Sequence, residues 1–137
     1  MRRWGLLAIG SVLLAALATA PVLALTPAQL PRSAASYASR EVFDRKYNEA
    51  YTYRAGGSID CKHRGGFNVR HCRAHWVVGD TGFVGWTRVA LYEKPNRSKV
   101  AVVGYRLRVI DEYCIYAEKR SPQACTRHER GRAQVTL

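Results

Sequence analysis

The chain has 137 residues and a formal net charge of +12, with 22 lysine and arginine residues against 10 acidic ones. This length gives room for one domain and excludes several. A balance this basic favours anionic partners, such as acidic wall polymers, lipid headgroups, nucleic acid or acidic proteins. The alternative is a solvated basic exterior that keeps the protein soluble without any specific anionic ligand.

Residues 1–24 have the order of a secretory signal peptide. The segment opens with the positive run MRR, continues without a charge over 4–25, and becomes rich in small residues near its end. Cleavage is expected between Ala24 and Leu25, and loss of the two arginines would lower the net charge from +12 to +10. The protein is then secreted, periplasmic or held in the cell envelope. An uncleaved membrane anchor is the alternative, because an uncharged stretch of this length can span a bilayer.

The next two segments predict a linker and a helix. Residues 25–33 contain two prolines and predict a short linker. Residues 34–51 contain no Gly or Pro and many helix-forming residues, which predicts an amphipathic helix. Its aromatic and apolar stripe, which needs a partner surface, consists of Tyr37, Val42, Phe43, Tyr47 and Tyr51.

From residue 58 onward, apolar and polar residues alternate with the period of a β-strand. Turn residues separate strands expected at about 58–63, 67–78, 83–93 and 99–110, with a short fifth strand at 113–117. Residues 127–137 predict a basic, flexible tail. The expected fold class is α+β: one N-terminal amphipathic helix packed on a four- to five-stranded antiparallel meander, in a single domain at 34–126.

The chain contains four cysteines: Cys61, Cys72, Cys114 and Cys125. An even number of cysteines in an exported chain favours disulfides. The simplest pairing joins Cys61–Cys72 and Cys114–Cys125, two local loops that would each stabilise the fold by about 3 kcal/mol. A zinc site with His63, His71 and His75 is the alternative, although these spacings match no common zinc finger. No cofactor or metal is expected.

Strand alternation separates an apolar sheet face from a polar one. A turn centred on Asp80-Thr81 would place Trp76 opposite Gly85 and make the apolar sets coincide beneath the helix. These sets are Cys72, Ala74, Trp76 and Val78; Phe83, Gly85, Thr87, Val89 and Leu91; and Val103, Tyr105, Leu107 and Val109.

The opposite face predicts a platform for an anionic partner. Arginine offers planar forks of donors to carboxylate or phosphate, and tryptophan offers a flat surface to a sugar, base or guanidinium. The alternative is an ordinary solvated sheet face, and a register shift of one residue would turn the tryptophan into the core. The candidate binding residues are His71, Arg73, His75, Trp86, Arg88, Arg106 and Arg108.

The segment CKHRGGFNVRHCRAHWVV, a cysteine-closed hairpin leading into a sheet after one helix, resembles small secreted bacterial proteins of unknown function. Residues 61–91 carry the resemblance, and the outline is also similar to cystatin-like domains, in which a sheet wraps a helix. The chain lacks the inhibitory Q-x-V-x-G segment of cystatins. The resemblance therefore implies fold and export and transfers no site residue.

These patterns predict an exported, non-catalytic binding domain that contacts an anionic partner: a cell-wall polymer, a lipid headgroup or an acidic protein. They indicate no catalytic residue and no specific nucleic acid. One alternative is a secreted hydrolase or nuclease that uses His71 or His75. Another is an inhibitor of an extracellular enzyme, with the GDTG or KPNR turn as the inserting loop.

Overall fold

The computed structural model describes residues 24–47 and 57–137. The predicted signal peptide, apart from its final residue Ala24, therefore lies outside the described residues, as does the predicted end of the long helix at 48–51. Across the two described ranges, every helix is too short or too polar to cross a membrane.

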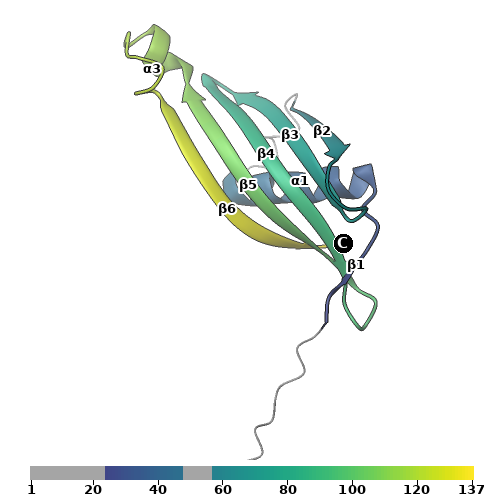
Figure 1. Cartoon of the computed structure of the whole chain (residues 1–137). Helices are drawn as coiled ribbons and strands as arrows, with labels where there is room; N and C mark the ends of the chain where they lie inside the picture. Colours follow the sequence, from purple (N-terminus) through teal and green to yellow (C-terminus); the bar gives the residue numbers. More distant parts are fainter. Residues whose placement is uncertain (1–23, 48–56) are drawn as a thin grey trace, which may run out of the picture.

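A six-stranded antiparallel sheet dominates the structure, and one long helix lies across it (Figure 1). The strand order is β2-β3-β4-β5-β6, and the short β1 pairs with the end of β4 that β3 does not reach. The elements are β1 (Thr26–Pro27), α1 (Arg32–Tyr47), β2 (Ser58–His63), β3 (Val69–Val78), β4 (Thr81–Glu93), β5 (Lys99–Asp111), α3 (Glu112–Tyr116) and β6 (Thr126–Thr136).

The expected fold class, an α+β domain with one N-terminal helix on a four- to five-stranded meander, is wrong. The described chain is mostly antiparallel sheet, the sheet has six strands, and α1 follows β1 in the chain. The sequence pattern undercounts the strands because the first and last of them carry little apolar alternation.

The segment 25–33 is not a free linker, because it packs against the sheet. Thr26 and Pro27 pair with the end of β4, and the backbone N–H of Ala28 donates to the carbonyl of Leu91. Leu30 is fully buried in the core. Pro27 lies in β1, an edge strand that tolerates proline, whereas Pro31 directly precedes α1 and its carbonyl accepts from the N–H of Ala35.

Two corrections concern the C-terminal part of the chain. The fifth strand expected at 113–117 is instead α3, because the Asp111 carboxylate caps the backbone N–H of Cys114 at 3.0 Å and starts a helical turn. The flexible tail expected at 127–137 is strand β6, which pairs with β5 from Thr126 to Thr136 and buries Val135.

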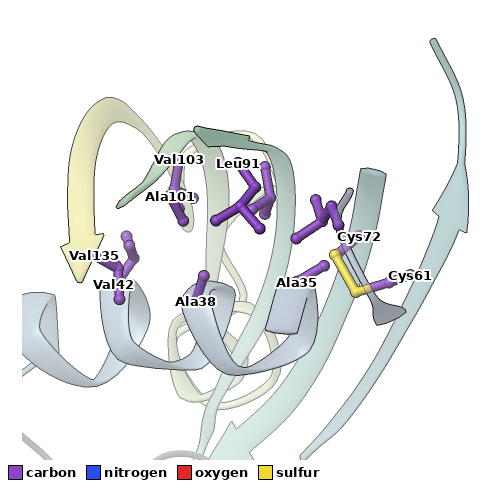
Figure 2. Close-up of a cluster of buried hydrophobic side chains, with 11 residues drawn as sticks. Ala35, Ala38, Val42, Cys61, Cys72, Leu91, Ala101, Val103 and Val135 are labelled. Atoms are coloured by element: carbon purple, nitrogen blue, oxygen red, sulfur yellow. A yellow bond between two sulfur atoms is a disulfide. The ribbon is translucent and has the colours of Figure 1, made fainter. Parts of the chain in front are cut away.

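The main core lies between α1 and the sheet (Figure 2). Ala35, Ala38 and Val42 of the helix point toward Leu91 and the neighbouring strands. The predicted aromatic stripe is therefore correct at Val42 and Phe43, whereas Tyr37 is exposed and small residues take its place. Small side chains bring the helix close to the sheet. Tyr47 and Tyr51 belong to the stripe, but their side chains lie outside the described residues.

The β3–β4 hairpin turns one residue earlier than expected. Val78 pairs with Thr81, so the turn residues are Gly79 and Asp80, and Gly79 adopts a φ of +58° that suits glycine. Trp76 consequently faces Phe83, not Gly85. This displaces the register by two residues, which keeps every side chain on its predicted face.

One buried polar contact joins the helix to the sheet. The hydroxyl oxygens of Ser39 and Thr87 are 2.7 Å apart, and both residues are buried. Either Ser39→Ala or Thr87→Val alone should lower the free energy of unfolding by about 1–3 kcal/mol, because the remaining hydroxyl loses its partner. The double variant should cost clearly less than the sum of the two, as measured by urea unfolding; additive costs would contradict the pairing.

Both predicted disulfides are confirmed. Cys61 bonds Cys72 across the β2–β3 hairpin, and Cys114 bonds Cys125, joining α3 to the segment that leads into β6. All four cysteines are thus oxidised, which leaves no thiolate among them for the alternative zinc site. Two disulfides in so short a chain indicate an oxidising compartment, either extracellular or periplasmic.

Candidate functional site

The middle of the sheet face that points away from α1 carries three rows of side chains, each crossing neighbouring strands. Thr87 and Gly85 contact the helix, so the residues between and beside them on β4 point the other way. We call these three rows the basic face. The rows are Ser58, His75, Val84, Arg108 and His128; Asp60, Arg73, Trp86, Arg106 and Arg130; and Lys62, His71, Arg88, Gly104 and Arg132.

All seven candidate binding residues lie on the basic face, as the register shows. The middle row places Trp86 between Arg73 and Arg106, one on each neighbouring strand. Neighbouring strands are about 4.8 Å apart, so these three side chains are immediate neighbours. Arg88 and both histidines, His71 and His75, are exposed to solvent.

The sequence reasoning missed the contribution of β6. His128, Arg130 and Arg132 continue the three rows across the last strand, but they fall in the segment expected to be a flexible tail. Their spacing of two residues is the signal that could have placed them on one face of a strand. Lys62 on β2 is a further cation that was not among the candidates.

The face is strongly positive because its single carboxylate is already engaged. Asp60 forms an ion pair with Arg32 and lies 3.9 Å from Lys62. The same three rows carry seven cationic side chains, namely Lys62, Arg73, Arg88, Arg106, Arg108, Arg130 and Arg132. Most of these guanidinium groups therefore lack a carboxylate partner on the face and can bind an external anion.

Trp86 is the centre of the face. It lines three adjoining open pockets, and its half-buried ring carries the Arg108 guanidinium at 5.8 Å from the ring centroid. Among the described residues, the buried Nε of Arg108 has no hydrogen-bond partner. The indole thus holds one guanidinium against its ring, beside the open pockets that Trp86 lines.

The arrangement of the histidines and of Asp60 favours neither catalysis nor metal binding. His71 and His75 line the same pocket as Asp60, but they stand four residues apart on one strand, roughly 13 Å. The Asp60 carboxylate, which could orient a catalytic histidine, is paired with Arg32. Within the described ranges, no group of three or more potential ligands is placed to hold a metal ion.

Comparison with known proteins does not assign a function to the basic face. No family model, no curated protein and no solved structure matches the chain. The similarity in outline to cystatin-like domains therefore stays a prediction, and the basic face has to be interpreted from its own residues.

Proposed function

We propose that the chain is an exported, non-catalytic binding domain that contacts an anionic partner through the basic face. The single observation that carries this proposal is the middle row, in which arginines of β3 and β5 flank Trp86 on β4 and an arginine of β6 extends the row. Export is supported by the order of residues in 1–24 and by the two disulfides.

The chemistry of the row favours an anion over an apolar ligand. Arginine keeps its charge at any physiological pH and presents paired donors that match carboxylate and phosphate oxygens. The flat indole adds contact area for the part of the ligand that carries the charge. A partner with several anionic groups, namely a wall polymer, a surface of anionic lipids or an acidic protein, would contact several rows at once.

Arg88→Ser combined with Arg106→Ser removes two charges from adjacent rows and should weaken binding about tenfold, since exposed ion pairs contribute roughly 0.5–1 kcal/mol each. Retention is measured on heparin, on cell-wall polymer and on vesicles containing anionic lipid. Earlier elution with salt is the expected result on the medium that resembles the natural partner.

The matched control is Lys94→Ser with Arg97→Asn, which removes the same charge from the β4–β5 turn, outside the three rows. Asparagine suits the positive φ of 65° at position 97. The control should elute close to wild type. If both double variants elute together, or if Arg88→Ser with Arg106→Ser changes nothing on all three media, the basic face is not the binding surface.

A further inference from the structure

The outer edge of β6 combines open backbone groups with three basic side chains. β6 is the last strand in the sheet order, and no described strand pairs with its other side (Figure 1). An edge of this kind can accept an additional strand from a partner, unless charges or covering groups prevent it. The hydrogen bonds at the two ends of the strand determine which backbone groups face the edge.

The odd-numbered residues that directly precede and follow β6 bond to the two ends of β5. The carbonyl of Cys125 accepts from Asp111, and the N–H of Leu137 donates to the carbonyl of Lys99. The carbonyl of the even-numbered Gln134 instead accepts from Arg45 of α1 at 3.2 Å. Because backbone groups alternate in direction along a strand, the even-numbered residues of β6 present their N–H and C=O groups to the edge.

These even-numbered residues are the ones whose side chains lie on the basic face. His128, Arg130 and Arg132 each offer an edge-directed backbone pair and an exposed cationic or titratable side chain. The contact from Arg45 to Gln134 covers the far end, so the open part of the edge ends near Arg132. A strand added there would place every second side chain beside one of these three residues.

The remaining side chains of the added strand would lie on the α1 side of the sheet, beside Glu129 and Gly131, and these two residues limit which side chains fit there. Glu129 is held by Lys46 at 3.2 Å and by Arg127 at 3.0 Å, so its charge is compensated within the chain. Gly131 has no side chain, and a Cβ built there would lie 2.6 Å from the Tyr105 hydroxyl oxygen. Next to these residues a small, uncharged side chain fits better than a second acidic one.

We propose that the β6 edge binds an extended acidic segment of a partner protein by strand addition, with an acidic residue at every second position. The inference rests on the proposed anion-binding face and specifies its partner class. Charge complementarity decides the occupant: the β6 edge of a second copy of this chain would bring arginines against arginines, whereas alternate carboxylates would pair with His128, Arg130 and Arg132.

The test uses a labelled peptide, acetyl-(Glu-Thr)₄-amide, and two N-methylated forms that carry the methyl groups on all glutamate nitrogens or on all threonine nitrogens. Charge and length are the same in all three. In antiparallel addition, the glutamate N–H groups face β6, so methylating them should weaken binding about tenfold more than methylating the threonines. The reverse asymmetry would still demonstrate strand addition, in the parallel orientation. Fluorescence anisotropy measures the affinities.

A pair of protein variants provides the complementary measurement. Arg132→Ser and Arg132→Pro remove the same charge, but only proline also removes the edge-directed N–H. Both should be retained equally on heparin, whereas Arg132→Pro should bind the peptide several-fold more weakly. The peptide series on the wild-type protein does not depend on whether Arg132→Pro folds.

Equal affinities of the two methylated peptides, or no binding of the unmethylated one, would overturn strand addition. Heparin retention that falls with Arg88→Ser and Arg106→Ser would then still support the basic face. If the basic face is not a binding surface, the variant with Arg88→Ser and Arg106→Ser should instead be retained as strongly as the wild type. The two proposals therefore fail with different results.

Discussion

Phe43→Ala should lower the free energy of unfolding by about 3–5 kcal/mol, the range for removing a fully buried aromatic side chain. Phe43 is completely buried, and its ring centroid lies 5.1 Å from that of Trp76 and 6.1 Å from that of Tyr105. It therefore links α1 to three strands through Trp76, Gly85 and Tyr105. Loss of the ring leaves a cavity that the rigid sheet cannot close. Urea or thermal unfolding measures the effect.

The neighbouring Gly85 supplies a sharp control. A Cβ built at this position would lie 2.5 Å from the Phe43 ring, so Gly85→Ala alone should cost about 1–3 kcal/mol through overpacking. In the Phe43→Ala background the added methyl group enters empty space, and its cost should disappear. The double variant would then be more stable than the sum predicts; additivity to within about 0.5 kcal/mol would contradict this contact.

Removal of either disulfide should cost about 3 kcal/mol, because both close loops of the same sequence separation, 11 residues. Cys61→Ala with Cys72→Ala should be the more damaging pair, since these sulfurs also belong to the core beneath α1 (Figure 2). Cys114 and Cys125 are also buried, but they lie outside this main core, so their replacement by alanine should cost little beyond the loop closure. Guanidinium unfolding without reductant compares the two double variants with wild type.

Reductant added to the wild-type protein should lower its stability below that of either double variant, because both loops open together. If Cys114→Ala with Cys125→Ala has the same midpoint of unfolding as the wild type, the Cys114–Cys125 disulfide contributes nothing to stability. If that pair proves the more damaging, burial of the Cys61–Cys72 sulfurs beneath α1 adds nothing beyond loop closure.

The central strands are predictable because their alternation is strong. In β3, β4 and β5 the apolar residues recur at every second position, so even a turn misplaced by one residue leaves Trp86 and the arginines on the correct face. The two cysteine pairs are predictable from equal spacing. Alternation alone thus brings the seven candidate residues together on one face of the sheet.

The last strand is not predictable from local pattern. Four of the eleven residues in β6 are charged, and only Ala133 and Val135 provide an apolar signal. The segment becomes a strand because β5 offers a complete partner along its length. The helical turn α3 depends on a single cap by Asp111, and the close approach of α1 depends on Ala35 and Ala38 in place of an aromatic residue. These features depend on tertiary contacts, which residue propensity and sequence periodicity do not predict.

From β2 to β6, every strand lies beside the strand that precedes it in the chain. Short loops join β2 to β3, β3 to β4 and β4 to β5, and only the β5–β6 connection at 112–125, which includes α3, is longer. Closing short loops has a low entropic cost, so most of the sheet can form without slow searches between distant segments. The N-terminal elements add contacts of much longer sequence separation, such as the hydrogen bond from Arg45 of α1 to the carbonyl of Gln134. A chain that emerges N-terminus first can therefore add strands in the order of their synthesis, and the three rows of the basic face are complete only when β6 pairs with β5.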